Sequence, residues 1–362
     1  MVYNLKMANI KEQTIKAVHL RIRDANVTDK LIQYIREGLA PLGVNFLCLE
    51  FNPGYNYRCF PELADGSFGR DEARKVAAAA REEGITIAPL FMCLGHQGWR
   101  FEKNALLKAH PEFDETPHVP EDGDAENTPD LEFYCHSWCA SNDDVYKYVF
   151  PMIDEIADDF GAEYFHVGMD EVFSLAEETC TRCKGKDRAE LFARTVNILH
   201  DHIVKKKGRK MIMWADRLNH AEAFGYHAWE GDIWGTWRAI DMIPKDIILA
   251  DWHYEMNEKG FGGIEALLEK GFTVLPAGWR ELKQTRFLLD EALKYAASAK
   301  VKGYAGLMPG MMITCWSEAN VDLLDTLLGA VKMREQNEEA KDARGIASSI
   351  VYMAEKLKDY KP

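Results

Sequence analysis

Eight short apolar segments recur along this chain of 362 residues, and stretches with helical character separate them. They span residues 17–22, 46–51, 85–91, 164–169, 211–215, 247–252, 272–276 and 311–316. Strands that alternate with helices are typical of a parallel sheet, and eight such units in a chain of this length favour a single (β/α)8 barrel of the TIM type. We therefore expect an α/β fold with one barrel domain over residues 1–362.

The segments between the predicted strands support this interpretation. Residues 71–83 are helix-forming and end at Gly84, and residues 189–207 carry apolar positions three and four residues apart before Gly208. No linker divides the chain, and the first predicted strand begins at residue 17, so we expect no accessory domain ahead of the barrel. From Val321 onward we expect extra helices, which cover either the barrel or a subunit interface.

A long irregular segment, residues 95–142, follows the third predicted strand and is rich in Pro, Glu, Asp and His. Long loops on the catalytic face of a barrel usually shape substrate access. Its acidic residues 121–124 lack the remaining spacing of an EF-hand, so we prefer a solvated turn to a calcium loop.

Charge and hydropathy argue against two classes of partner. The net charge of −14 disfavours binding to the phosphate backbone of nucleic acids. No apolar segment is long enough to span a bilayer, and the N-terminus lacks a basic region followed by a long apolar stretch. We expect a protein of the cytoplasm, or a secreted chain already trimmed of its signal, that binds neither nucleic acid nor membrane.

Chemistry is expected where the fourth predicted strand ends. The apolar positions Phe165, Val167 and Met169 lead directly into two adjacent acids, Asp170 and Glu171. In a barrel of parallel strands the carboxyl ends of the strands form the catalytic face. The alternative is a surface pair of acids at the start of the next helix, where the helix dipole favours negative charge.

Several motifs in this order resemble glycoside hydrolase family 20, the β-N-acetylhexosaminidases. His166, Gly168, Asp170 and Glu171 fill the pattern His-x-Gly-x-Asp-Glu of that family. Further matches are residues 60–63, residues 85–96 with Leu94 in place of the proline of a Pro-Gly-His turn, and residues 316–318, which read Trp-Ser-Glu. Motifs that match independently and in register are more specific than one pair of acids.

The resemblance implies an exo-acting enzyme that removes terminal β-linked GlcNAc or GalNAc with retention and without a cofactor. In this family the 2-acetamido group of the substrate acts as nucleophile. By resemblance, Glu171 is the general acid and then the base, while Asp170 orients the acetamide and stabilises the oxazolinium intermediate. Which of the two sugars is preferred, and how many subunits assemble, stay open.

The resemblance and the strand ends also indicate residues that bind the sugar. By resemblance Arg23 binds its outer hydroxyls, with Arg21 as second choice, because a guanidinium donates to two neighbouring hydroxyls. The other expected contacts are His96, His166, Trp214, Trp252, Tyr254, Trp279, Trp316 and Glu318. Tryptophans suit this role because pyranose C–H bonds stack on aromatic faces, although each one alone is as compatible with core packing.

Two loops depart from the family. After the second predicted strand an aspartate should contact the histidine of the third strand, and only Glu50 or Asn52 can replace it here. After the seventh strand the family carries a tyrosine that holds the acetamide, whereas this chain has Trp279. We expect Tyr254, after the sixth strand, to supply that hydroxyl.

Eight cysteines without a secretory signal suggest thiols rather than disulfides. Two pairs, Cys135 with Cys139 and Cys180 with Cys183, are expected on the same face of the barrel, where four thiolates can close a structural zinc site. Free buried thiols are the preferred alternative.

Two rival functions remain. One is a retaining glycosidase in which Glu318 is the nucleophile and Glu171 the acid, which requires carboxyls about 5 Å apart. Strands four and eight face each other across a barrel, so that separation looks too long. The other is a barrel that binds sugars without cleaving them, suggested by the two altered loops.

Overall fold

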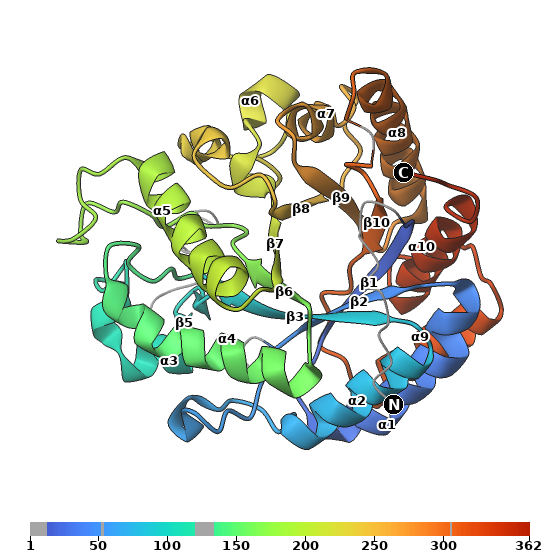
Figure 1. The fold of residues 1–362 in the computed structure, drawn as a ribbon, viewed down its shortest axis with the longest axis horizontal. Helices are drawn as coiled ribbons and strands as arrows, with labels where there is room; N and C mark the ends of the chain where they lie inside the picture. The colour runs from blue at the N-terminus through green and yellow to red at the C-terminus, as the bar shows by residue number, and fades with distance from the viewer. Residues whose placement is uncertain (1–12, 52–53, 120–133, 305) are drawn as a thin grey trace.

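A computed structural model describes residues 13–51, 54–119, 134–304 and 306–362. Eight parallel strands close into a barrel in the order β1-β10-β9-β8-β7-β6-β3-β2 (Figure 1). The strands are β1 (Ile15–Arg21), β2 (Phe46–Glu50), β3 (Thr86–Cys93), β6 (Tyr164–Gly168), β7 (Lys210–Trp214), β8 (Ile248–Trp252), β9 (Thr273–Gly278) and β10 (Gly310–Ile313). The predicted α/β barrel and each of its eight strands are confirmed.

Alternation along the strands divides the apolar side chains between two cores. Ile15 and Ala17 of β1 belong to the cluster that fills the barrel, whereas Val18 and Leu20 belong to the cluster between the strands and the helices. Successive side chains of a strand point to opposite faces, so His19 and Arg21 continue the inward set. The end of β1 therefore delivers polar groups into the mouth of the barrel.

Helices surround the barrel (Figure 1). They are α1 (Thr28–Gln33), α2 (Arg70–Glu82), α3 (Ala105–Ala109), α4 (Tyr146–Phe160), α5 (Arg188–His200), α6 (Ala221–Phe224), α7 (Gly262–Glu269), α8 (Leu282–Val301), α9 (Val321–Lys332) and α10 (Ala343–Lys356). The helices expected at 71–83 and 189–207 are present, the second ending in a π-helical stretch, Asp201–Lys206. None of the helices in the described ranges is long and apolar enough to cross a bilayer.

The C-terminal helices cover the barrel where its two ends meet. α10 packs against α8 and α9 and also contacts β1 and β10, the strands whose pairing closes the sheet. In Figure 1 these red helices lie beside the blue first strand. The helices after Val321 therefore cover the barrel, which is one of the two roles expected for them.

The segment after β3 is more ordered than the sequence suggested. It contains a small hairpin of β4 (Gly98–Trp99) and β5 (Glu102–Lys103), followed by α3. The expectation of one irregular loop over 95–142 is therefore wrong for this part, since two-residue strands and a five-residue helix are too short for a periodicity signal. The acidic stretch 121–124 lies outside the described residues.

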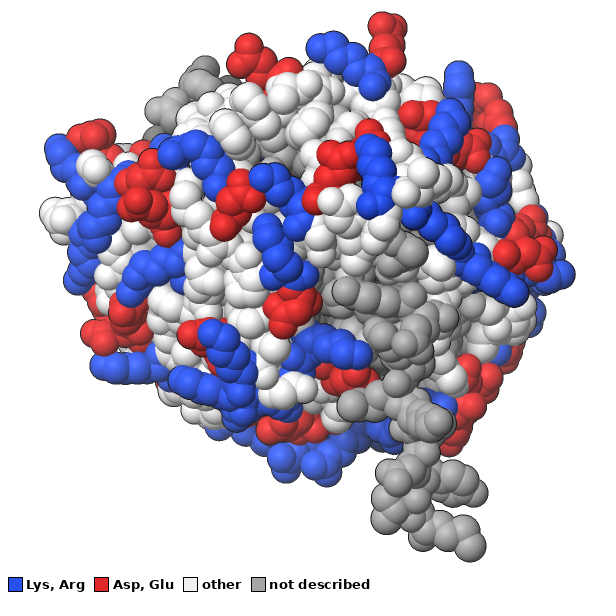
Figure 2. Space-filling view, turned by 45° about the horizontal axis from the view of Figure 1, so that its top comes forward, with Lys and Arg blue, Asp and Glu red and all other residues white. Residues whose placement is uncertain are grey.

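Charges of both signs are mixed on the surface. Figure 2 shows Lys and Arg side chains interspersed with Asp and Glu on one face. Many form exposed ion pairs, such as Lys205 with Asp201 and Lys302 with Glu265. A mixed surface of this kind produces no strong field for a polyanion.

Candidate active site

A cavity of about 850 Å³ opens at the carboxyl ends of the strands. Its volume lies in the range of small-molecule sites. Among the residues that line it are the sequence-predicted Arg23, His96, Asp170, Glu171, Trp252, Tyr254, Trp279 and Trp316, together with Arg21, the second choice for the arginine. The structure therefore gathers most of the predicted site around one pocket.

The turn after β6 places the two acids at the pocket wall. Gly168, Met169 and Glu171 have φ of 65°, 74° and 48°, in the left-handed region that side chains other than glycine rarely adopt. A Cβ on Gly168 would lie 2.6 Å from Sδ of Met92. Local strain of this kind collects at functional sites, and here it turns Asp170 and Glu171 toward the cavity.

His96 lies between the two carboxyls. Its Nε2 is 3.3 Å from Oδ2 of Asp170 and 3.3 Å from Oε2 of Glu171. Burial disfavours the charged ring, but the Asp170 carboxylate and its neighbours outweigh burial and raise the pKa of His96 well above its usual range. A protonated imidazole at this position donates hydrogen bonds to both carboxyls.

The loop after β3 approaches the acids closely. Leu94 and His96 have φ of 65° and 53°, and a Cβ on Gly95 between them would lie 2.9 Å from the carbonyl oxygen of Asp170. Leu94, which stands in place of the proline of the family motif, still forms the turn. Only glycine at position 95 lets the two loops pack so tightly.

Asp216, which the sequence reasoning missed, holds the backbone of the catalytic turn. Its Oδ2 accepts the N–H of Glu171 at 2.9 Å and the Nε–H of the buried Arg217 at 2.7 Å. Burial raises the pKa of Asp216 to about 7 against the attraction of Arg217. Its position directly after β7, on the catalytic face, was the signal that could have identified it.

Aromatic side chains line the side of the pocket formed by β8, β9 and β10. The rings of Trp252 and Tyr254 are stacked at 4.9 Å, and Trp279 lies 5.3 Å from Tyr254. Trp316 donates its Nε1–H to the Tyr254 hydroxyl at 2.9 Å and lies 4.8 Å from the ring of His19. The wall is therefore rigid and is tied to the floor of the barrel.

The hydroxyl of Tyr254 has one proton to donate. Its oxygen lies 3.1 Å from Oγ1 of Thr314, which is also 2.9 Å from the carbonyl oxygen of Gly278. That carbonyl also accepts the backbone N–H of Thr314 at 2.9 Å. The Thr314 hydroxyl can thus turn toward Tyr254 without leaving the carbonyl unpaired, which frees the Tyr254 proton for a bound ligand.

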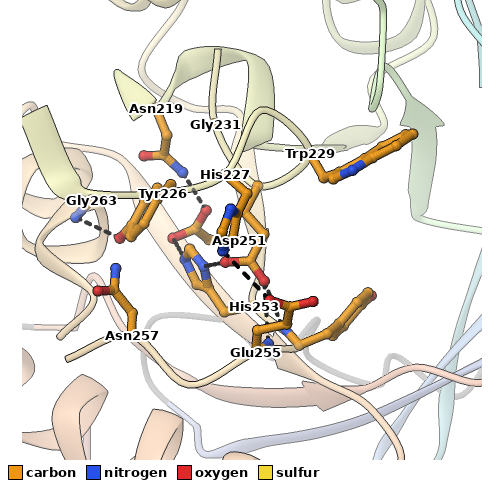
Figure 3. A network of polar contacts seen from close by, with 12 residues as sticks. Asn219, Tyr226, His227, Trp229, Gly231, Asp251, His253, Glu255, Asn257 and Gly263 are labelled. Atoms are coloured by element: carbon orange, nitrogen blue, oxygen red, sulfur yellow. Dashed lines mark hydrogen bonds and ion pairs between the residues drawn. The ribbon is translucent and has the colours of Figure 1, made fainter. Parts of the chain in front are cut away.

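A buried charge network surrounds His253, with Asp251 beside its ring (Figure 3). Nδ1 of His253 lies 3.1 Å from Oε2 of Glu230, and Nε2 lies 3.1 Å from Oδ2 of Asp251. Burial opposes the charge, but Asp251 and Glu230 raise the pKa of His253 to about 10. Because Glu230 also accepts the Tyr254 N–H at 2.8 Å, this imidazolium fixes the backbone at the pocket wall.

Three further aromatic residues form the outer wall, and sequence reasoning missed them. Tyr134 lies 4.4 Å from Trp99 and 4.5 Å from Trp229, measured between ring centroids, and all three line the cavity. Trp99 and Tyr134 belong to the long segment after β3. Aromatic residues in a loop on the catalytic face were the available signal.

At the first strand, Glu50 organises the inward-facing groups. Its Oε2 lies 3.0 Å from Nε2 of His19, and its Oε1 lies 3.2 Å from Nε of Arg21. Burial opposes ionisation, but Arg21 and His19 outweigh it and lower the pKa of Glu50. The ion pairs of Glu50 are thus with His19 and Arg21 rather than with His96. Asn52, the other candidate for that contact, lies outside the described residues.

Both candidate arginines line the cavity, but they are held differently. Arg21 is paired with Glu50 and donates to the carbonyl of Trp316 at 3.1 Å. Arg23 is paired at 3.0 Å with Asp65, which also lines the cavity. Arg21 is therefore held by Glu50 and by the Trp316 carbonyl, and Arg23 is held by Asp65.

Three predicted sugar contacts do not line the cavity. His166 and Trp214 are fully buried with their rings 4.5 Å apart, and Nδ1 of His166 accepts the N–H of Gly168. Burial, with help from His19, lowers the pKa of His166 well below its usual range. Glu318 is exposed beside the backbone of Arg21. Direct contact of these three residues with the sugar stays a prediction, and their positions outside the cavity lining do not support it.

The cysteines are arranged differently from the expected set of four. Cys139 lies 3.3 Å from Cys183 and 3.5 Å from Cys180, measured between Sγ atoms, but Cys135 is not part of this group. Its thiol instead faces the carbonyl of Glu171 at 3.3 Å. The predicted ligand set is thus wrong at Cys135, because the backbone of Cys135 pairs with Trp99 whereas that of Cys139 bonds to Phe113. Glu115 occupies the fourth place.

Known proteins share part of this sequence. Residues 52–282, more than half of the chain, match the family model described as glycosyl hydrolase family 20, catalytic domain. The chain is 24% identical over 238 residues to β-hexosaminidase 1 of Coccidioides posadasii, and 25% identical over 264 residues to a β-hexosaminidase of Vibrio furnissii. These alignments cover 60% and 70% of this chain but only 35% and 36% of the relatives, so the chain spans about a third of their length.

Solved structures show the same fold. A β-N-acetylhexosaminidase from Bacteroides fragilis superposes with a TM-score of 0.60 at 16% identity, covering 94% of this chain and 66% of that one. An exo-β-N-acetylglucosaminidase from Vibrio harveyi, solved with N-acetylglucosamine, gives a TM-score of 0.61 at 18% identity, covering 93% and 54%.

Proposed function

Because the chain belongs to glycosyl hydrolase family 20, we propose that it is an exo-β-N-acetylhexosaminidase that releases terminal β-linked GlcNAc or GalNAc with retention. One observation carries the proposal: Asp170 and Glu171 lie side by side at the wall of a deep pocket, with the cationic His96 3.3 Å from a carboxyl oxygen of each.

The proposed reaction uses the acetamide of the substrate as nucleophile. Glu171 donates a proton to the glycosidic oxygen as the bond to the anomeric carbon breaks, and the acetamide oxygen bonds to that carbon. Asp170 accepts the acetamide N–H and stabilises the positive charge of the oxazolinium. Glu171 then takes a proton from water, which attacks the anomeric carbon and restores the acetamide. This chemistry requires no cofactor, since side chains supply proton transfer and charge stabilisation.

The proposed sugar subsite lies along the aromatic wall. Trp252, Trp279 and Trp316 offer faces for the pyranose ring, and the Tyr254 proton is directed to the acetamide oxygen. Arg23 and Arg21 are the candidates for the outer hydroxyls, and the fixed position of Arg21 beside Glu50 supports it over Arg23. An ordered guanidinium loses less entropy when it binds two hydroxyls.

No observation favours the rival in which Glu318 is the nucleophile, because that side chain is exposed and does not line the cavity. The hydrolysis assay described next also distinguishes the proposed enzyme from a barrel that binds sugars without cleaving them.

The test is hydrolysis of the nitrophenyl β-glycosides of GlcNAc, GalNAc, glucose and galactose. We expect cleavage of the N-acetyl sugars only, and a fall in kcat of about 10²–10⁴-fold in Glu171→Gln and in Asp170→Asn. Glu83→Gln, an exposed site at the end of α2 on the opposite side of the barrel, is the matched control. Cleavage of the plain glycosides would favour the Glu318 mechanism, and sugar binding without any cleavage would favour the silent barrel.

The proposed partner is a carbohydrate with a terminal N-acetylhexosamine, and the same panel measures the preference for gluco or galacto substrates. We place the protein in the cytoplasm, since three thiols within 3.5 Å of a neighbour would oxidise readily elsewhere. Cell fractionation tests this location.

A further inference from the structure

We propose that Glu115, Cys139, Cys180 and Cys183 bind one Zn²⁺ ion, which joins the long segment after β3 to the segment after β6. One carboxylate oxygen and three Sγ atoms all lie within 4.8 Å of one another. None of the four residues lines the catalytic cavity, so the site is separate from the one that performs hydrolysis.

The separations between sulfur atoms suit a tetrahedral metal. Zinc–sulfur bonds of about 2.3 Å at tetrahedral angles place two thiolates about 3.8 Å apart. Cys139 lies 3.3 Å from Cys183 and 3.5 Å from Cys180. An outward movement of a few tenths of an ångström at these sulfurs brings both pairs to the separation of a tetrahedral site.

The burial of the Glu115 carboxylate also points to a bound cation, independently of the distances between the sulfur atoms. The side chain is 0% exposed, and its Oε1 accepts the N–H of Glu177 at 3.0 Å. Its Oε2 is buried without a hydrogen-bond partner. A carboxylate is rarely buried unless it is paired or coordinates a metal, and one carboxylate oxygen of Glu115 lies within 4.8 Å of the three Sγ atoms.

The ligands come from three short segments that the fold holds in register. Cys180 and Cys183 belong to a tight turn, in which Lys184 N–H bonds to the Cys180 carbonyl at 2.9 Å. Glu115 and Cys139 belong to two strands of chain that face each other, since Glu115 N–H bonds to the Ser137 carbonyl at 3.0 Å. A Cys-x2-Cys turn joined by ligands from elsewhere is the usual plan of a structural zinc site.

Zinc fits the donor set better than other common cations. Thiolates are soft ligands that select zinc, copper(I) or iron, whereas calcium and magnesium require oxygen ligands. Four protein ligands leave no open position, which indicates a structural ion and not a catalytic one.

The ion would stabilise the segment of the pocket wall that carries Tyr134, although the ion itself would lie outside the cavity. The segment that holds Cys139 also holds Tyr134, which lines the cavity, and Cys135, whose thiol faces the Glu171 carbonyl. The Cys180–Cys183 turn follows Glu171 along the same chain. Zinc would therefore fix the relative position of two loops that meet beside the catalytic acids.

The experiment is elemental analysis of the full chain, purified under reducing conditions and reconstituted with Zn²⁺, with competition by a colorimetric chelator. We expect one zinc per chain and a lower Tm after removal of the ion. Glu115→Gln keeps the shape of the side chain but loses the anionic oxygen, and should weaken zinc binding at least about tenfold. Cys180→Ser should lose the ion, whereas Cys135→Ser should bind zinc normally.

Two results would overturn the proposal. One is reconstituted, fully reduced protein that holds no zinc and has the same Tm with and without chelator. The other is equal loss of zinc in Cys135→Ser and Glu115→Gln, which would mean a different ligand set. If Cys180→Ser fails to fold, the Glu115 and Cys135 variants decide. Because the readout is metal content, the result does not depend on whether the protein hydrolyses hexosaminides.

Discussion

His253 is buried with a carboxylate at each ring nitrogen, and its positive charge compensates the buried negative charges of Glu230 and Asp251. Replacing it by glutamine leaves Glu230 and Asp251 without a cation. Removing one partner of a buried ion pair typically costs about 3–5 kcal/mol. We expect His253→Gln to lose this amount of unfolding free energy near neutral pH, measured by urea denaturation.

The pH dependence of this loss follows from the pKa of His253. The pKa rises from about 6.5 in the unfolded chain to about 10 in the folded one. The stabilisation is therefore complete below about pH 6.5 and disappears as the pH rises through about 10. His227→Gln is the matched control, because that histidine is exposed. A difference between wild type and His253→Gln that does not shrink toward pH 10 would contradict the assignment of charge.

Tyr254 donates the one hydroxyl proton that the pocket offers near Trp316. If it holds the acetamide, Tyr254→Phe should lower kcat/KM for N-acetyl substrates by about 10–100-fold, the value of one strong hydrogen bond. Thr314→Val is the comparison, because it removes the hydroxyl that donates to the Tyr254 oxygen, leaves the Tyr254 proton in place and does not alter a residue that lines the cavity. Equal losses in both variants would show that Tyr254 has only a structural role.

Single residues were predictable where a motif or a strand end marked them, as for Asp170, Glu171 and His96. The alternation of side chains along a strand also places His166 inside the barrel, but alternation does not tell how far from the pocket a side chain lies along the barrel axis. His166 and Trp214 face inward and are fully buried without lining the cavity. Trp252, which lies two residues beyond Ala250, the register partner of Trp214, does line it. The position of Asp216 after β7 marked it as a candidate, but its role, like that of Glu230, depends on how the turns after β7 fold back toward Glu171 and Tyr254.

The turn after β6 concentrates strain that the rest of the fold must offset. Gly168 has φ of 65° and no room for a Cβ, whereas Gly271 has φ of 86° with no atom within 4 Å of the added Cβ. Gly271→Ala therefore tests backbone strain alone, at a cost of about 1–2 kcal/mol. Gly168→Ala adds a clash with Met92 and should cost about 2–4 kcal/mol in urea denaturation.

Activity separates the two variants further. We expect Gly168→Ala to lose hydrolysis even at temperatures where it is folded, since the turn positions both acids. Gly271→Ala should keep it. Similar stability and activity in both variants would mean that the approach of Gly168 to Met92 has no role in forming the site.

The strands were predictable as elements because each is a short apolar run bounded by helix signals. The hairpin of β4 and β5 was not, since it is held by contacts across the loop, such as the pairing of Trp99 with Cys135. The same limit applies to the cysteines. Spacing predicted two pairs on one face, but only the folded path of residues 134–139 shows that Cys135 turns toward Glu171 and that Glu115 lies beside the other three thiols.

At the level of the whole chain, the barrel depends on contacts between its most distant parts. β1 pairs with β10, and Cys315 N–H bonds to the His19 carbonyl at 3.1 Å. The pocket combines side chains from Arg21 to Trp316, so it is complete only when the barrel closes. Alternation of strands and helices predicts this closure, because eight parallel strands with inward and outward apolar faces leave no stable open edge.

In the proposed mechanism the acetamide of the substrate, not a carboxylate of the protein, attacks the anomeric carbon. The most direct test is kcat for a series of nitrophenyl β-glycosides whose 2-acetamido methyl group carries zero to three fluorine atoms. Fluorine withdraws electrons from the acetamide oxygen, so we predict a steady fall on the order of 100-fold across the series, about 2.7 kcal/mol of barrier. A rate that is independent of fluorine would contradict the account and indicate a nucleophile supplied by the protein.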